Sequence, residues 1–285
     1  MLAERGQNCT LHGSSKLSNW RAVQGGCALR RLLALLLLWC THSLADQPVL
    51  RFSVAESWSM PLVRVEGGQP VEGLLFDLIQ ALAREADVRP EYHVMARLRL
   101  QQAMEAGDID VRCYVSTQWL NDRPGDFVWS IPLFQQRDVL VGRAGDADAV
   151  QPEQLQPQAI GTVLGYAYGT LEPFFAQGRL QREDSRSQQL ALQKLQIGRY
   201  QHAVSNELSL QWFNKVLPAG QQLQVQAVLE EQALGCMVRN DPTIPTQGIL
   251  RALVRMKQSG EIERIVQRYG AREYLGRVSA ASPRE

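Results

Sequence analysis

Val49-Leu50-Arg51-Phe52-Ser53-Val54 is the first part of the stretch that decides the fold class. Its side chains alternate along the chain, which predicts a strand. Apolar residues then recur at helical spacing over residues 74–85, and strand patterns follow at 91–94 and 110–116, with a short helix at 98–106 between them. This β-α-β-α-β order predicts a parallel sheet covered by helices.

A second series of the same kind begins after a strand at residues 138–142 and a polar segment at 143–158. We expect strands at 159–164, 201–205, 223–227 and 233–239. Helices are expected at 165–175, 188–195, 207–213, 249–256 and 262–269. The chain therefore carries two similar β/α units in tandem, followed by one more strand and two helices.

The tandem units predict an α/β fold with two lobes around a ligand cleft. We assign residues 46–141 and 232–270 to lobe 1, residues 142–231 to lobe 2, and residues 271–285 to a flexible tail. Two hinge crossovers are expected near residues 141–146 and 227–232. Ligands of such sheets bind at the carboxyl ends of strands, so the cleft is the expected small-molecule site.

The N-terminus resembles an export signal. Arg30 and Arg31 precede a leucine-rich run, and Ser43-x-Ala45 provides a cleavage site before Asp46. The run is about half the ~20 residues that span a bilayer. We therefore expect residues 1–45 to be removed and the mature protein to be periplasmic and soluble. The leader is long, and a translation start near Val23 is a further hypothesis.

Composition excludes several classes of function. The formal net charge is +1 and no long basic run occurs, which disfavours a nucleic-acid partner. After cleavage the cysteines would be Cys113 and Cys236, either bridged or free, and the histidines His93 and His202. These four have no metal-ligand spacing, so zinc enzymes and serine hydrolases lose their usual machinery and no cofactor is expected.

Five blocks of the mature chain resemble one family. They are Val71 to Leu78, similar to G-f-d-x-d-L; Met104 to Asp110, similar to L-x-x-G-x-i-D; Arg123 to Pro132, similar to R-x5-F-[ST]-x-P; Gly198 to Val204, similar to G-r-x-D-A-v; and Lys257 to Ile262, similar to k-x-d-G-t-x. Their order resembles the type II periplasmic solute-binding proteins, in the branch that serves polar amino-acid transporters (family 3). The resemblance covers nearly all of residues 50–270.

The resemblance implies a set of ligand-binding residues. Arg123 would hold the ligand's carboxylate, because a guanidinium can donate two parallel hydrogen bonds, with Ser116 beside it. Arg99 matches a variant motif and is the alternative anchor. Glu207 would receive the ligand's amino group, although a glutamate at a helix N-terminus is also favoured by the helix dipole alone.

Other positions of the implied site are aromatic. Gly165-Tyr166-Ala167 opens the helix where the family has G-T-T or G-S-T, so the hydroxyls are absent, but backbone N–H groups there could hold an anion. Trp58 and Trp119 could stack on the ligand or belong to the core. The resemblance also places the strand of Cys113 beside that of Cys236, where a disulfide can form if the side chains share a face.

The implied function is a periplasmic solute-binding protein. It would be a monomer without enzymatic activity that captures an amino acid or related carboxylate, closes by hinge motion, and presents it to a membrane ABC permease. Two alternatives remain. One is a cyclohexadienyl or arogenate dehydratase-like enzyme with Glu172 or Glu207 as general acid. The other is a stand-alone periplasmic sensor receptor.

Overall fold

β1 (Val49–Ala55) is at the centre of the first half of the sheet, and its Leu50, Phe52 and Val54 are fully buried. It pairs in parallel with β4 (Arg89–Met95) and β5 (Val111–Val115). α2 (Leu74–Ala86) and α3 (Arg97–Glu105) connect these strands, as the hydrophobic periodicity predicts. The computed structural model describes residues 47–120, 126–146 and 150–270, all within one unit that begins at Gln47.

The two halves of the sheet share a long strand, β11 (Gln224–Arg239), which pairs with β7 (Phe134–Gly142). Residues 224–234 of β11 are antiparallel to β7, and residues 235–238 are antiparallel to β5. The prediction of two separate strands at 223–227 and 233–239 was wrong, because these residues belong to one continuous strand. The sequence between them is polar because Glu230 and Gln232 face the polar side chains of β7, not because the strand ends.

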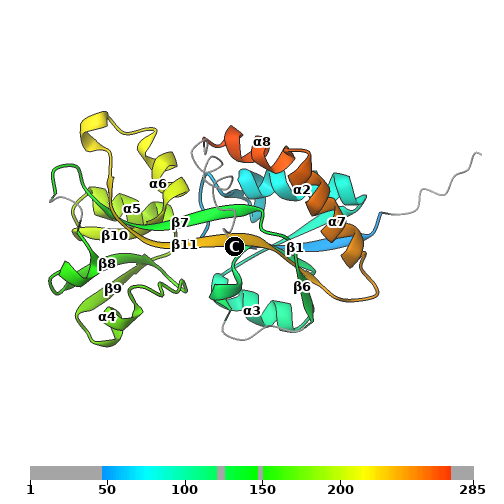
Figure 1. Ribbon diagram of the computed structural model, residues 1–285, viewed down its shortest axis with the longest axis horizontal. Coiled ribbons are helices and arrows are strands. Elements are labelled where there is room, and N and C mark those ends of the chain that lie inside the picture. The colour runs from blue at the N-terminus through cyan, green and yellow to red at the C-terminus, as the bar shows by residue number, and fades with distance from the viewer. Residues whose placement is uncertain (1–46, 121–125, 147–149, 271–285) are drawn as a thin grey trace, which may run out of the picture. The chain divides into compact units, whose positions relative to one another are not determined.

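In the second half, β7 is followed in the sheet by β10 (His202–Asn206), β8 (Gln158–Val163) and β9 (Leu180–Ser185). α5 (Gln188–Gln196) and α6 (Glu207–Asn214) lie on one face, and α4 (Glu172–Ala176) lies near β9 on the other (Figure 1). β9 was not predicted, because its charged sequence Gln-Arg-Glu-Asp hides an edge strand.

The helix predicted to open at Gly165 was wrong. Gly165 has a φ of 76°, and residues 166–171 form turns before α4 begins at Glu172. The Tyr168 hydroxyl accepts a hydrogen bond from the backbone N–H of Val163 at 2.8 Å. This turn places two tyrosines, not a helix N-terminus, after the strand.

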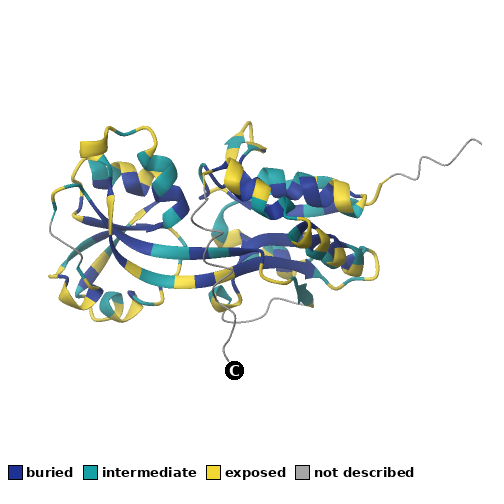
Figure 2. Ribbon diagram, turned by 45° about the horizontal axis from the view of Figure 1, so that its top comes forward, coloured by how far each residue is buried: buried dark blue, intermediate teal, exposed yellow. Residues whose placement is uncertain are grey.

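α7 (Thr246–Gln258) and α8 (Glu261–Arg268) return the chain to the first half, where they pack against α2. Figure 2 shows their buried stripes facing the sheet and their exposed residues facing outward. The remaining strands are the hairpin of β2 (Arg64–Glu66) and β3 (Gln69–Glu72), and β6 (Phe127–Trp129), which pairs with β11.

The α/β fold class is confirmed, but the sheet is mixed. The strand order is β4-β1-β5-β11-β7-β10-β8-β9. The pairs β5–β11, β11–β7 and β7–β10 in the middle of this order are antiparallel. Residues 138–141 of β7 already pair with β10 in the second half. That pairing favours a first crossover before Asp138, earlier than the predicted boundary at 141, and the lobe limits stay a prediction.

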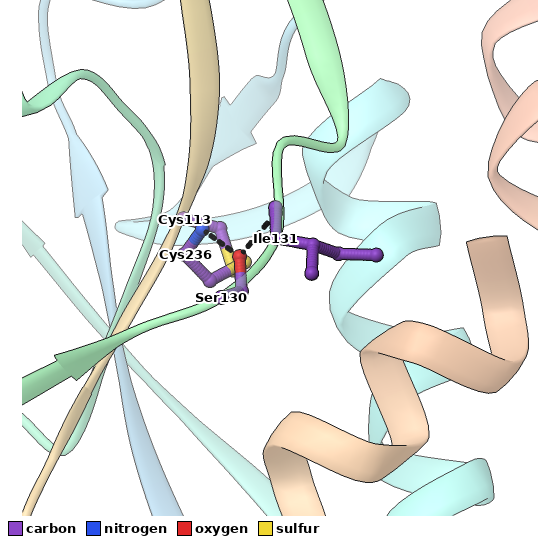
Figure 3. Close-up of a disulfide and its surroundings, with 4 residues drawn as sticks. All are labelled: Cys113, Ser130, Ile131 and Cys236. Atoms are coloured by element: carbon purple, nitrogen blue, oxygen red, sulfur yellow. Dashed lines mark hydrogen bonds between the residues drawn. A yellow bond between two sulfur atoms is a disulfide. The ribbon is translucent and has the colours of Figure 1, made fainter.

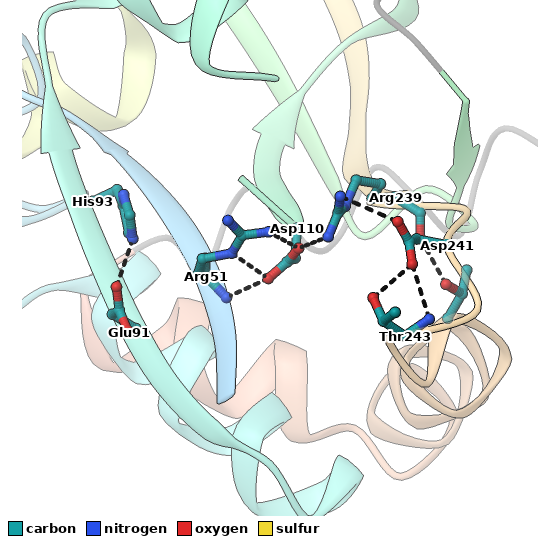
Figure 4. Close-up of polar contacts among 8 residues, drawn as sticks. Arg51, Glu91, His93, Asp110, Arg239, Asp241 and Thr243 are labelled. Carbon is teal, nitrogen blue, oxygen red and sulfur yellow. Dashed lines mark hydrogen bonds and ion pairs between the residues drawn. The ribbon is translucent and has the colours of Figure 1, made fainter. Parts of the chain in front are cut away.

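A buried carboxylate ties three strands of the first half together (Figure 4). Asp110 accepts hydrogen bonds from the backbone N–H of Arg51 at 2.9 Å and from its side chain at 2.9 and 2.7 Å. Arg239 of β11 donates another at 2.7 Å. Burial alone would raise the pKa of Asp110, but the hydrogen bonds from Arg51 and the charges of both arginines hold it below its usual value.

Candidate functional site

A cavity lies where the loops at the carboxyl ends of the parallel strands of the two halves meet. Five aromatic side chains line it: Trp58, Tyr114, Trp119, Tyr166 and Tyr168. The first three come from the first half of the sheet and the two tyrosines of the turn after β8 from the second. The space between the walls is about 20 Å³, roughly the room that one water molecule needs. The two halves therefore meet closely around this site.

Arg97, the first residue of α3, lies across the cavity. Its guanidinium carbon is 4.5 Å from the ring centre of Tyr166 and 5.3 Å from that of Trp119. Its Nε donates a hydrogen bond to the carbonyl of Gly165 at 3.1 Å. Among the described residues, no carboxylate forms an ion pair with Arg97. The stacked rings hold the guanidinium in place and leave its two terminal nitrogens for an anion.

A second guanidinium is close behind the first. Arg112 of β5 is 4% exposed, and its nearest polar contact among the described residues is the sulfur of Met104 at 3.7 Å. Its Nε has no hydrogen-bond partner. Burial, followed by the positive charge of Arg97, lowers the pKa of Arg112 to about 10. Neither guanidinium forms an ion pair with a carboxylate of the described residues, so their combined positive charge favours an anion beside Arg97.

Another part of the lining is polar and carries one acidic group. Gln136 and Asp138 of β7 line the cavity together with Gln188 and with Ser205 and Asn206 at the end of β10. Gln136 Nε2 donates to Asp138 Oδ1 at 2.8 Å. Asn206 caps α6 by accepting from the N–H of Ser209 at 2.8 Å, so its side chain is already oriented. The cavity lining thus combines one cationic and one acidic side chain with aromatic rings.

The structure brings only some of the predicted site residues to this cavity. Trp58, Trp119 and Tyr166 line it, and Gly165 borders it through the carbonyl that accepts from Arg97. A hydrogen bond of 3.3 Å joins the Ser57 hydroxyl to the Tyr166 hydroxyl across the two halves. Because no helix begins at Gly165, the predicted anion site at a helix N-terminus there is absent from this turn.

Glu207 is positioned away from the lining. It forms an ion pair with Arg137 at 3.2 Å, and the same arginine pairs with Glu231 at 2.9 Å. A carboxylate that already has a guanidinium partner is a weaker acceptor for a ligand's amino group. The residue that lines the cavity is Asn206, which directly precedes the Glu207 indicated by the resemblance.

Two of the predicted residues, Ser116 and Arg99, do not line the cavity, and a third lies outside the described residues. Ser116 is buried, and its hydroxyl accepts from the N–H of Gln118 at 3.3 Å. Arg99 is exposed on α3 and does not line the cavity. Arg123 lies outside the described residues.

The family can now be assigned. Residues 51–272 match the sequence profile of the bacterial extracellular solute-binding proteins, family 3. The chain belongs to that family. Its members act outside the cytoplasm as receptors for small solutes, and the cavity has the position that this function requires.

Solved structures agree with the fold of family 3. An ancestral arginine-binding protein bound to arginine is 20% identical, with a TM-score of 0.65 over 79% of this chain and 99% of that one. The substrate-binding protein of an amino acid ABC transporter is 19% identical, with a TM-score of 0.61 over 79% and 100%. A histidine kinase sensor domain with similarity to periplasmic binding proteins is 18% identical, with a TM-score of 0.63 over 81% and 97%. No curated protein sequence matches the chain.

The two cysteines of the described ranges are joined in this structure (Figure 3). Cys113 of β5 and Cys236 of β11 are register partners, and a disulfide connects their side chains. The backbone N–H of Cys236 donates to the Ser130 hydroxyl at 2.9 Å, and that hydroxyl donates to the Ile131 carbonyl at 2.7 Å. The bridge lies in the interior of the first half, away from the cavity lining.

Two further classes of feature were searched for in the described ranges. No group of three or more histidine, cysteine or acidic side chains there could hold a metal ion. None of the described helices combines the length and the apolar character that a membrane crossing requires.

Arg97 and Asp138 are the charged residues of the cavity lining that the sequence analysis did not select. Arg97 stands two positions before Arg99 in the motif that was considered, and the start of α3 at Arg97 turns the earlier arginine toward the cavity. Asp138 is preceded by Gln136 at a spacing that places both on one face of β7. No local pattern singles out Asp138, because β7 contains a continuous polar run over residues 135–138.

Proposed function

We propose that this protein captures a small solute with a carboxylate group, such as an amino acid or a related acid, and delivers it to a membrane ABC transporter. One observation carries the proposal. Arg97 presents a guanidinium without a carboxylate partner, among the described residues, at a cavity that both halves of the sheet line. The family assignment and the similarity to an amino acid transporter's binding protein support it.

Arg97 is proposed as the carboxylate anchor in place of Arg99. Its Nε donates a hydrogen bond to the carbonyl of Gly165, but the two terminal nitrogens can still donate a pair of hydrogen bonds to a carboxylate. Trp119 and Tyr166 stack on its faces and restrict its rotamers, which lowers the entropy cost of binding. Arg123, with Ser116 beside it, remains a proposed anchor on the strength of the resemblance alone.

Closure is proposed to occur by a hinge in β7 and β11, the two strands that both halves share. The contacts of Arg97 with Gly165 and of Ser57 with Tyr166 join the halves in the closed form. A solute would enter when these contacts separate and would replace part of them on closing. The export signal at residues 1–45 lies outside the described residues, and periplasmic location is part of the proposal.

A sensor receptor is the second candidate, because a histidine kinase sensor domain shares the fold. Copurification with a permease or with a signalling protein would separate the two roles. The dehydratase-like alternative has less support, since neither Glu172 nor Glu207 lines the cavity. Incubation with prephenate or arogenate, followed by product analysis, would test it.

The proposal is tested with two arginines of the same helix. Arg97→Ala should weaken binding of a carboxylate ligand at least tenfold, because a charge-assisted hydrogen bond contributes roughly 1.5–3 kcal/mol. Arg99→Ala is the matched control, since Arg99 is exposed and does not line the cavity. Isothermal titration calorimetry measures both. Equal affinities for the two variants would contradict the role of Arg97.

A further inference from the structure

Asp138 belongs to a polar quartet on the two crossover strands. Asp138 and Glu230 are register partners across β7 and β11, and Gln136 and Gln232 form the next pair on the same face. Gln136 donates to Asp138, and Gln232 donates to Glu230. Each carboxyl therefore has one glutamine from its own strand, and the two carboxyls face each other across the ladder.

The quartet has more acceptors than donors among the described residues. Glu230 Oε1 accepts from the backbone N–H of Thr170 at 2.8 Å and from its hydroxyl at 3.2 Å. Asp138 Oδ2 accepts no hydrogen bond from the described residues. Gln232 is 4% exposed, and its Oε1 also has no donor. Of the two carboxyls only Asp138 lines the cavity, so a ligand group that donates hydrogen bonds there would satisfy Asp138.

The surroundings make the charged form of Asp138 unfavourable when the site is empty. Burial, and next the negative charge of Glu230, raise the pKa of Asp138 to about 7, while Gln136 and Arg97 partly oppose the shift. The other titratable groups facing it are Tyr166 and Tyr168, whose pKa values are raised by burial and which are neutral at pH 7. Gln188 of α5 and Asn206 of β10 are uncharged.

We propose that Asp138 receives the amino group of the ligand, and that this carboxyl releases a proton when the ligand binds. The inference rests on the proposed function, because it places the second pole of the solute opposite Arg97. An ammonium supplies the missing donors and the missing positive charge together. Glu207, the residue expected in this role, is already paired with Arg137.

The proposal determines the sign of a pH dependence. In the empty site the carboxyl of Asp138 is protonated below its raised pKa, whereas an ammonium ligand binds its carboxylate form. Affinity should be constant well above pH 7 and fall about tenfold for each pH unit below it, so that binding at pH 5 is roughly 100-fold weaker than at pH 8. A ligand that instead accepts a hydrogen bond from protonated Asp138 would show the opposite slope.

The test compares amino acids with 2-hydroxy acids of the same carbon skeleton. The probes are glutamate with 2-hydroxyglutarate, phenylalanine with 3-phenyllactate, and arginine with its 2-hydroxy analogue, titrated calorimetrically from pH 5 to pH 8.5. We expect the best amino acid to bind at least tenfold more tightly than its hydroxy counterpart at pH 8, with the slope given above. Asp138→Asn should remove both the preference and the slope, and Asp146→Asn, whose carboxylate pairs with Arg143 outside the lining, should remove neither.

The outcomes separate the inference from the function on which it rests. Tighter binding of the hydroxy acids, or a slope that persists in Asp138→Asn, would overturn the role of Asp138 and leave carboxylate capture intact. Failure of both series to bind would contradict the proposed function itself. The comparison of the two series in the unmodified protein decides the question even if Asp138→Asn does not fold.

Discussion

Removal of the disulfide between Cys113 and Cys236 should destabilise the protein strongly. The bridge closes a loop with a sequence separation of 123 residues. In the chain-entropy treatment, a loop of that length restricts the unfolded chain by about 16 cal/mol/K, or about 4.9 kcal/mol at 25 °C. For a domain of this size, that loss corresponds to a decrease of about 10–20 °C in Tm.

The assay is urea denaturation of the wild-type protein and of the double variant Cys113→Ala/Cys236→Ala, each with and without reductant. Because both cysteines are buried, reductant acts on the wild type mainly after unfolding. The wild type refolded under reductant should therefore match the double variant, whose stability should not respond to reductant. A difference below about 1 kcal/mol between oxidised wild type and double variant would refute the reasoning.

Two further predictions concern single residues. Asp110→Asn should cost about 1.5–3 kcal/mol, because the buried carboxylate that accepts charge-assisted hydrogen bonds from Arg51 and Arg239 becomes an uncharged amide, while Arg239 keeps its ion pair with Asp241. The pKa of Asp110 is lower in the folded state than in the unfolded state, so its contribution to stability is complete above the unfolded pKa near 4 and is lost as pH falls through the folded pKa. In urea melts, the wild type should therefore lose its advantage over the variant in acid. An advantage that persists at low pH would contradict this. Tyr166→Phe removes only the hydroxyl bonded to Ser57 and should leave ligand affinity within about threefold. Tyr166→Leu also removes the ring stacked on Arg97 and should weaken binding more. Equal effects of the two variants in calorimetry would show that the stacking is unimportant.

Much of the fold could be predicted because most elements carry regular hydrophobic patterns. Leu50, Phe52 and Val54 alternate, and the strand they predict is β1 with one residue more. Two strands were misread: β9, whose sequence is charged, and β11, where Glu230 and Gln232 interrupt the apolar pattern. Glu230 and Gln232 are register partners of Asp138 and Gln136 in β7, and a polar pairing inside a strand resembles a loop in the sequence.

The site was predicted less well than the fold, for a geometric reason. The resemblance indicated helix α3 and the turn before α6, but a register difference of one or two residues decides which side chain faces the cavity. Arg97 rather than Arg99, and Asn206 rather than Glu207, line it. Asp138 could not be found from local pattern, because its importance depends on Glu230, which is 92 positions away in the chain and adjacent only across the ladder.

The most direct test of solute capture is a thermal-shift screen of the protein against amino acids, opines, polyamines and small organic acids. A ligand at about 100 times its dissociation constant should add about 2.7 kcal/mol of stability, which raises Tm by roughly 5–11 °C. The account predicts a saturable increase with at least one carboxylate-bearing solute, and a much smaller one in Arg97→Ala. Stabilisation by polyamines alone, or by no solute in the panel, would contradict it.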